Sequence, residues 1–439
     1  MGPPHTPRRI ECASTGKPVD EERKGLRYNG NGAFEAVWQA GRLAVRHAPA
    51  VTHPFTMGIY LDNNATTPLV LGALEAMRPW LGDRPGNAAS SHAFGRRARR
   101  ALEDARETIA CLLDADPDEV LFTSGATEAN NLALFGLASP ALGVVVTSAI
   151  EHPSVVEPVR QLVAQGVRHM LLPVDAAGSV GAMAMELPAD VRLVSVMLAN
   201  HETGAVQPVA ALAEHFAGRA PFHCDAAAAA GKVPVCFHRL GVTALTVSGH
   251  KIHGPPGIGA LLLKRGAKLR PLFWGGHQQH GRRPGTEPVA LAVGMAAALA
   301  WCERYRQENL ARVMDLRQRL LSGLRAQAAP VVLNGPETGG IPHTLNMSFP
   351  GCAADVLLMK LDLAGVACST GSACSSGSLL PSPVLKAMGL STPNLRSAMR
   401  FSLSSLLTDR EIDEAVRHIS CCASELRRAS VEGNSAPSS

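Results

Sequence analysis

Short apolar runs alternate with segments of helical periodicity between about residues 100 and 265. Segment 96–114 carries a stripe typical of an amphipathic helix, at Leu102, Ala105, Ile109, Leu112 and Leu113. The expected strands are VLFTSG (120–125), LGVVVTSA (142–149), RLVSVMLAN (192–200), FHCDAA (222–227), LTVSGH (245–250) and GIGALLLK (257–264). Strands separated by helices predict an α/β fold with a mostly parallel sheet and helices on both faces.

Most polar side chains near these apolar runs lie in the turns that follow them. Ligands of parallel sheets bind at the carboxyl ends of the strands. We therefore expect five turns to share one rim of the sheet: SGATE (124–128), SAIEH (148–152), NHETG (200–204), CDAA (224–227) and SGHK (248–251).

The chain beyond about residue 306 predicts a second, smaller domain. It begins with a helical stretch, QENLARVMDLRQRLLSGLRAQ (307–327). Near the end, Thr408 and Glu411 have the spacing of a capping box. Apolar residues continue that helix at Ile412, Ala415, Val416 and Ile419, and residues 431–439 are expected to form a flexible tail.

Residues 1–56 differ in character from the rest. They are polar and rich in turn formers, with a weak helical pattern at Phe34, Val37, Trp38 and Leu43. MGIYLDNNATTP, from Met57, resembles the start of a domain. We expect residues 1–56 to be either a disordered arm or upstream sequence translated from a wrongly chosen start codon.

The composition narrows the class of protein. The formal net charge of the 439 residues is +5 without a dense basic block, so nucleic acid is not an expected partner. No apolar run reaches the roughly 18–20 residues of a membrane helix. The first 30 residues lack the apolar core of a signal peptide, so we expect a cytoplasmic protein. The ten cysteines are then expected to be thiols, and their spacing with histidine indicates no metal site.

A lysine stands directly after a predicted buried strand, at Lys251. A partly desolvated lysine can act as an amine nucleophile, although such a lysine is also a common solvated loop residue. Asp225 ends another strand on the same rim. An acid and a lysine that face one cleft suit pyridoxal phosphate, and they equally suit a simple salt bridge.

A candidate phosphate cradle lies at SGATEANN (124–131), which follows a strand and opens a helix. The N–H groups of a helix start bind phosphate well, and the Thr127 hydroxyl would add a donor. Ser248 and His250 are expected to complete the cradle.

Nine motifs in register carry a resemblance. They are YLDNNATTP, GNAASSHAFGRRAR, FTSGATEANN, EHPSV, NHETGAVQP, HCDA, SGHKIHGPPGIGAL, RRPGTEP and GSACSSGSLLPSPVLKAMG. Together, from about Tyr60 to about Arg427, they resemble the cysteine desulfurases of the class V aminotransferase group, which are fold type I pyridoxal-phosphate enzymes. The resemblance implies a large cofactor-binding domain (71–306) with a seven-stranded type of sheet. It also implies a small α+β domain (57–70 and 307–430).

The resemblance implies roles for the matching residues. Lys251 would bind the cofactor covalently, Asp225 would pair with its pyridine nitrogen, and His152 would stack on the ring and move protons. Thr286 would reach the phosphate across the interface of a homodimer. The full set of expected cofactor contacts is Ala126, Thr127, His152, His201, Asp225, Ser248, His250, Lys251 and Thr286. The expected substrate contacts are Asn63, Ala65, Thr66 and Arg400, with Arg400 binding the carboxylate.

Cys374, in GSACSSG, matches the nucleophile of these enzymes. Its run of Gly and Ser suits a loop that carries a thiol to L-cysteine and then carries the persulfide to an acceptor. The loop length resembles the branch that passes sulfur directly to proteins. Iron–sulfur scaffold assembly, tRNA thiolation and a dedicated metallocluster pathway all remain open as destinations.

The chain departs from the family pattern at two rim positions. His201 stands where the family commonly has Asn, and Ala228 where it usually has Gln. Either His201 supplies the donor that Ala228 lacks, or water fills the gap. Cys368 is a second oddity, which either pairs with Cys374 or fills a small pocket.

Three other readings remain. Selenocysteine lyases also resemble this chain over much of its length, although GSACSSG is closer to the cysteine-using enzymes. A catalytically silent binding subunit is compatible with the departures at His201 and Ala228. A pyridoxal-phosphate enzyme for transamination or elimination would leave Cys374 without a role.

Overall fold

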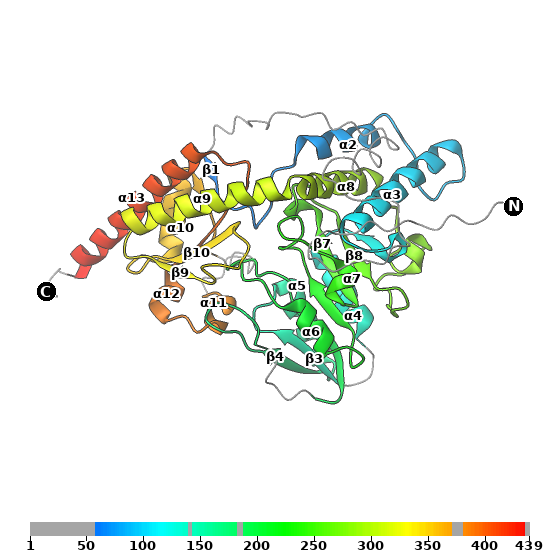
Figure 1. Ribbon diagram of the computed structural model, residues 1–439, viewed down its shortest axis with the longest axis horizontal. Coiled ribbons are helices and arrows are strands. Elements are labelled where there is room, and N and C mark those ends of the chain that lie inside the picture. The colour runs from blue at the N-terminus through cyan, green and yellow to red at the C-terminus, as the bar shows by residue number, and fades with distance from the viewer. Residues whose placement is uncertain (1–57, 139–142, 182–187, 371–380, 435–439) are drawn as a thin grey trace, which may run out of the picture.

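The computed structural model describes residues 58–138, 143–181, 188–370 and 381–434. Figure 1 shows two groups of elements joined by one long helix, α9 (Arg306–Gln327), which runs from α8 (Val289–Arg304) beside the larger sheet to α10 (Ala354–Leu363) and α13 (Asp409–Asn434). None of the helices in the described ranges has the length and apolar character needed to cross a bilayer.

The larger sheet confirms the predicted fold class. Among the described residues, seven strands pair in the order β2-β8-β7-β6-β5-β3-β4. All run parallel except β8, which is antiparallel to both β2 and β7. The strands are β2 (Val120–Thr123), β3 (Val144–Ser148), β4 (Arg168–Leu172), β5 (Val191–Ser195), β6 (Phe222–Asp225), β7 (Ala244–Ser248) and β8 (Gly259–Leu263).

Edge strand β4 is absent from the predicted series. Most of its side chains face solvent or are half-buried, and Leu171 is 52% exposed. The strand therefore lacks the continuous apolar run that identifies strands covered on both faces.

Alternate strand residues face two separate hydrophobic cores. Phe122 and Leu262 belong to one core, whereas their neighbours Leu121 and Leu261 belong to the other. This is the two-residue period of strands. On the first side, α2 (Leu71–Leu81) and α3 (Ala93–Leu112) pack against α8, and on the second α4 (Ala126–Leu137) packs against α5 (Pro153–Ala164).

Short elements connect these layers: α6 (Val209–His215), α7 (Phe237–Leu240), η1 (Pro117–Glu119), η3 (Gly249–Lys251) and η4 (Gln278–Gly281).

The other group of elements has its own core. A three-stranded antiparallel sheet has the order β12-β10-β9, and β1 pairs in parallel with β11. The bounds are β1 (Ile59–Tyr60), β9 (Val332–Asn334), β10 (Thr344–Ser348), β11 (Val366–Ala367), β12 (Ala398–Ser402), α11 (Pro383–Ala387) and α12 (Thr392–Arg396). Leu61, Leu316, Phe349 and Phe401 are buried together in this core. The domain boundaries at residues 70 and 306 stay a prediction.

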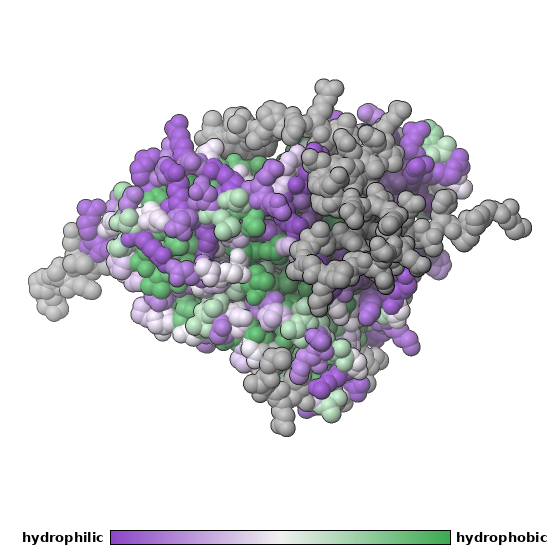
Figure 2. All heavy atoms as spheres, in the orientation of Figure 1, coloured by the Kyte–Doolittle hydropathy of each residue, from purple (hydrophilic) through white to green (hydrophobic). Residues whose placement is uncertain are grey.

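Helix α13 begins with the capping box that the sequence predicts. Glu411 N donates to Thr408 Oγ1 at 3.2 Å, and Thr408 N donates to Glu411 Oε2 at 2.7 Å. Figure 2 shows hydrophilic residues gathered over α9 and α13 on this face, with apolar residues below them toward the middle of the molecule.

Candidate active site

Lys251 lies in η3, directly after the buried strand β7. Its Nζ donates to the carbonyl oxygen of Asn64 and, at 3.0 Å, to that of Ala65. The turn that follows β1 therefore closes over the rim of the larger sheet, and the lysine amine lies between the two.

Asp225 ends β6, the strand next to β7. The residue is 6% exposed, and two donors hold its carboxylate: Asn130 Nδ2 at 2.8 Å and Ala227 N at 2.9 Å. These bonds fix the direction of the carboxylate beside the lysine turn. Such an acid suits a ring nitrogen that must stay protonated.

The predicted phosphate cradle contains a buried hydroxyl group that is free to form a hydrogen bond. Ser248 ends β7, is fully buried, and its Oγ has no hydrogen-bond partner in the described part of the chain. Across β8, Gly125 caps α4, which begins at Ala126 and carries an exposed Thr127 in its first turn.

Gly259 allows these two pieces to approach. A Cβ at this position would lie 2.7 Å from the Gly125 carbonyl carbon and 2.8 Å from Val247 O. The first N–H groups of α4 have no partner within the helix, and with the free Ser248 hydroxyl they form a donor set for an anion. The residues present therefore fit a phosphate group.

His250 lies beside Lys251 in η3. Burial, followed by the charges of Lys251 and Lys232, lowers its pKa to about 4. The ring is neutral at physiological pH, so His250 would contact a phosphate through a hydrogen bond and not through a positive charge.

His152 caps the N-terminus of α5. Its Nδ1 accepts from Ser154 N at 3.1 Å, and burial, opposed by Asp225, lowers its pKa below the ordinary value of 6.5. Because Nδ1 accepts a backbone N–H, the proton of the neutral ring lies on Nε2.

His201 meets His152 edge to face. The ring centroids lie 5.0 Å apart at 76°, and the His201 Nδ1 is buried without a partner among the described residues. Burial lowers the pKa of His201 well below its ordinary value, and the neighbouring His152 adds to the effect. An unpaired ring nitrogen agrees with the hypothesis that His201 compensates for Ala228, which stays a prediction.

Arg400, on β12, faces the same turn from the smaller sheet. It is 3% exposed, and its guanidinium donates to Asp62 Oδ1 at 2.7 Å and to His201 O at 3.4 Å. Its Nε is buried without a partner in the described ranges. The Asp62 contact is a feature that sequence reasoning missed, because the two residues lie 338 positions apart.

The other predicted substrate residues lie in the turn between β1 and α2. Asn63 is buried, and its Nδ2 donates to Ser402 O at 2.9 Å while its Oδ1 has no partner in the described part of the chain. Ala65 and Thr66 are exposed. The turn thus presents one free amide oxygen and two small exposed residues next to Arg400.

A shallow pocket of about 370 Å³ lies beside the rim, between α4 and α5. Its lining residues are Thr127, Asn131, Phe135, His152, Pro153, Ser154, Glu157, Pro158 and Gln161. Two of the predicted cofactor residues therefore share one depression of the surface.

Thr286 is exposed, in the loop before α8. Arg283, three residues earlier, forms a bidentate ion pair with Glu128 of α4, at 2.7 and 3.0 Å. This pair holds the Thr286 loop near the start of α4. The role predicted for Thr286, in the site of a second copy, stays a prediction.

Cys374 lies outside the described residues, so its predicted role rests on its motif alone. Cys368 is described, and burial raises the pKa of its thiol to about 12. A protonated thiol favours the pocket-filling reading of Cys368 over a reactive one.

Sequence reasoning also missed Asn64 and Lys232. Asn64 stands inside the quoted DNNATT motif, and Lys232 is the single charged residue in the apolar run AAAAAGKVPV. An isolated charge in such a run could have indicated that Lys232 is a buried polar residue near the site.

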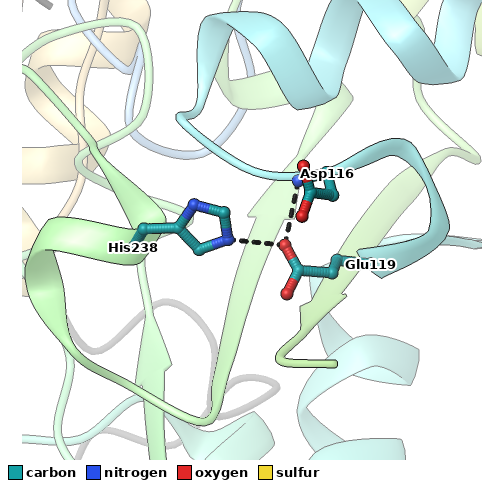
Figure 3. Close-up of side chains that lie close together, drawn as sticks. All are labelled: Asp116, Glu119 and His238. Carbon is teal, nitrogen blue, oxygen red and sulfur yellow. Dashed lines mark hydrogen bonds and ion pairs between the residues drawn. The ribbon is translucent and has the colours of Figure 1, made fainter. Parts of the chain in front are cut away.

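Asp116, Glu119 and His238 bring ligand-type atoms together beside the N-terminal end of β2, away from the rim (Figure 3). Glu119 Oε2 accepts from His238 Nε2 at 2.7 Å and from Asp116 N at 2.9 Å. Arg265 donates its N–H to Glu119 Oε1 at 2.9 Å and pairs with Asp116 at 3.2 Å. These bonds satisfy the cluster from within the chain, so we assign it a structural role.

Comparison with known families gives one match over most of the chain. The model of the family "Aminotransferase class-V" matches residues 59–415. "Cysteine desulfurase 2" of Trichormus variabilis is 41% identical over 384 residues, which cover 86% of this chain and 96% of the relative. The "IscS-like cysteine desulfurase" of Mycobacterium tuberculosis is 42% identical over 387 residues, covering 85% and 98%.

Solved structures agree with these relatives. A "NifS-like protein" superposes with a TM-score of 0.79 at 33% identity, covering 84% of this chain and all of its own. A structure described as "SspA in complex with cysteine" superposes with a TM-score of 0.70 at 33% identity, covering 79% and 98%.

Proposed function

Because this chain belongs to the class V aminotransferase family and is a cysteine desulfurase, we propose that it binds pyridoxal 5′-phosphate at Lys251 and transfers the sulfur of L-cysteine to Cys374. The observation that carries this proposal is the meeting of Lys251, Asp225 and the unpaired Ser248 hydroxyl on one rim. When bound, the cofactor supplies an electron sink next to the substrate α-carbon.

The chain offers a holder for each part of the cofactor. Lys251 would bind it covalently, and the Asp225 carboxylate would face the pyridine nitrogen. The phosphate would be held by the first N–H groups of α4 at Ala126 and Thr127, by Ser248 and His250, and by Thr286 of a second copy. His152 and His201 would contact the ring and its hydroxyl.

Arg400 would hold the carboxylate of L-cysteine. Its guanidinium is already oriented by Asp62, and its buried Nε retains an unused donor. A bidentate guanidinium–carboxylate pair fixes both the position and the rotation of an amino acid. Asn63, Ala65 and Thr66 would line the remainder of the pocket.

The geometry suggests different parts for Lys251 and His152. His152 carries its proton on Nε2 and already accepts through Nδ1, so the neutral ring can donate a hydrogen bond but has no free nitrogen to receive a proton. We therefore assign removal of the α-proton to the Lys251 amine and hydrogen-bond donation to His152 Nε2.

Sulfur transfer would take place at Cys374. Its thiolate attacks the substrate sulfur, an S–S bond forms, and the C–S bond of L-cysteine breaks. Cysteine and a protein thiol thus become alanine and a protein persulfide, with no external oxidant or reductant. We further propose that the protein is a cytoplasmic homodimer. It would pass this sulfur to a protein acceptor, either for iron–sulfur cluster assembly or for the thiolation of tRNA.

Purified protein tests the proposal directly. We expect a visible cofactor band, and we expect added L-cysteine to yield alanine and persulfide in equal amounts until an acceptor is supplied. Cys374→Ala should keep the band and lose the persulfide. Cys368→Ala is the matched control and should keep both. A protein with a visible band that makes neither product would contradict the assignment of L-cysteine.

A further inference from the structure

Asn130 is a polar residue on the otherwise apolar buried face of α4. The buried residues of this helix are Ala129, Asn130, Leu132, Ala133, Leu134, Gly136 and Leu137. Asn130 is fully buried, at 0% exposed. Burying an amide costs free energy unless its groups are hydrogen-bonded, so the bonds of Asn130 should explain its place in the helix.

The Asn130 side chain is held through its two donors. One N–H of Nδ2 donates to Asp225 Oδ2 at 2.8 Å, and the other donates to Ser154 Oγ at 2.8 Å. The Oδ1 atom is buried without a partner among the described residues. A reversed amide would place that oxygen against the Asp225 carboxylate, so the donors must face this way.

Ser154 continues the chain of bonds to His152. Its backbone N donates to His152 Nδ1 at 3.1 Å, which makes this ring nitrogen an acceptor. The Ser154 hydroxyl oxygen lies 2.8 Å from the same Nδ1. Because this oxygen accepts from Asn130, the hydroxyl proton is free to point at Nδ1. The bonds therefore have one direction, from Asn130 through Ser154 to His152.

Asn130 and Ser154 bridge two strands that are not neighbours. Asp225 ends β6 and His152 follows β3, and β5 lies between these strands in the sheet. The backbones of strands two apart are separated by about 10 Å, so the sheet alone does not set how the two side chains are turned. Helices α4 and α5, which pack against each other, supply the two residues that do so.

We propose that Asn130 is a positioning residue that couples Asp225 to His152: one N–H fixes the Asp225 carboxylate, and the other acts through Ser154 to keep the His152 proton on Nε2. The asparagine thereby sets the orientation of an acid and the tautomer of a ring with one side chain. Both residues are proposed contacts of the cofactor ring, so this inference rests on the proposed function.

The first measurement determines which nitrogen of His152 carries the proton. Heteronuclear NMR of the full-length protein, labelled with a nitrogen isotope at its histidines, distinguishes the tautomers, and a His152→Asn spectrum identifies the signal. We expect the Nε2–H form in the wild type. In Ser154→Ala the ratio of the Nε2–H to the Nδ1–H form should fall roughly fivefold, because one donor to Nδ1 is lost. In Asn130→Ala it should fall about threefold, because the hydroxyl loses the bond that directs it.

The second measurement concerns the Asp225 end. Pyridoxal 5′-phosphate is added back to protein from which the cofactor has been removed, and the visible band gives its Kd. Asn130→Ala should raise this Kd roughly tenfold, because the Asp225 carboxylate loses one of its two donors. Ser154→Ala keeps both donors and should stay close to the wild type. One variant is thus expected to change both ends, and the other only the His152 end.

Asn334→Ala is the matched control. Asn334 is 4% exposed, and its Nδ2 also donates to two side chains at 2.8 Å, namely Asn346 Oδ1 and Ser348 Oγ. This variant should lose stability and keep both the wild-type tautomer and the wild-type Kd. If it changed them as Asn130→Ala does, the effect would be one of stability and the inference would fail.

Two further outcomes would overturn the inference. One is an unchanged His152 tautomer in both Ser154→Ala and Asn130→Ala. The other is a wild-type His152 with its proton on Nδ1, which needs no variant. A wild-type protein without a visible band would instead count against the proposed cofactor, and the tautomer measurement would still decide the role of Asn130.

Discussion

On the proposed cofactor side of the site, Asp225 and Lys251 stand at the ends of adjacent strands of one sheet. On the proposed substrate side, Asp62 lies in the turn after β1 and Arg400 lies in β12, 338 positions away in the sequence. The ends of two neighbouring strands therefore place the cofactor side. On the substrate side, backbone hydrogen bonds of Ser402 with Asn63 and Leu61 join the two segments, and the ion pair of Asp62 with Arg400 orients the guanidinium.

This difference implies that a substitution can impair one side of the site and leave the other side intact. A change in the rim of the large sheet removes a chemical group but leaves the strands paired. A change in the ion pair leaves each strand intact but releases the guanidinium that we propose binds the substrate. Variants on the two sides should therefore differ in which quantity they move: the cofactor band or KM for cysteine.

The largest effect is expected for Lys251→Ala. It should lose the visible cofactor band and lower kcat by roughly 10⁴-fold, because the proposed covalent attachment and the proposed proton acceptor disappear together. Absorbance and alanine formation measure both. The exposed Lys264→Ala should behave like the wild type. A Lys251→Ala protein that still turned over cysteine would refute the assignment of the cofactor side.

Arg400→Lys should sharpen the comparison. We expect KM for cysteine to rise about 10- to 100-fold, since lysine offers a point charge where the guanidinium offers two directed bonds. The visible band should stay as in the wild type, because no cofactor contact is assigned to Arg400. A loss of the band in this variant would show that the two sides are coupled.

Asp62→Asn should have a smaller effect of the same kind. The Asp62 side chain is 21% exposed, so water screens part of its attraction for Arg400. Asparagine can still accept one bond from the guanidinium. We expect KM to rise roughly threefold to tenfold with little change in kcat. If kcat fell instead, Asp62 would have a role beyond orienting Arg400.

The smallest effect concerns the sheet that holds the cofactor side. His223 on β6 is fully buried between Ser195 and Thr246, with contacts of 2.8 and 3.0 Å, and burial lowers its pKa to about 4. The unfolded chain binds a proton below about pH 6.5 that the folded chain refuses until about pH 4, so stability falls across that window as the pH drops.

His223→Gln keeps hydrogen-bonding groups but does not titrate. Its Tm should fall less than that of the wild type between about pH 6.5 and pH 4, by about 2–4 °C for each kcal/mol of difference. Thermal unfolding followed by circular dichroism measures this. Equal losses in both proteins would assign the acid sensitivity to other groups, such as His253, whose pKa burial also lowers to about 4.

The order of apolar runs was enough to predict the large sheet and its rim, because central parallel strands are covered on both faces and read as continuous apolar segments. The motifs around Lys251 and Asp225 were equally readable, since each lies within a few residues of a strand end. Edge strand β4 was not predicted, because its exposed side chains interrupt any continuous apolar run.

Only the tertiary structure decided which groups meet across the site. The ion pair of Asp62 with Arg400 and the contact of Lys232 with Asn64 join residues 338 and 168 positions apart. The local pattern of apolar and polar residues reports how a residue is placed within its own helix or strand. It carries no information on which distant side chain lies beside that residue in the folded protein. The sequence by itself thus determined the sheet and the identity of the chemical groups, whereas packing between the sheets decided their partners and, through burial, their charges.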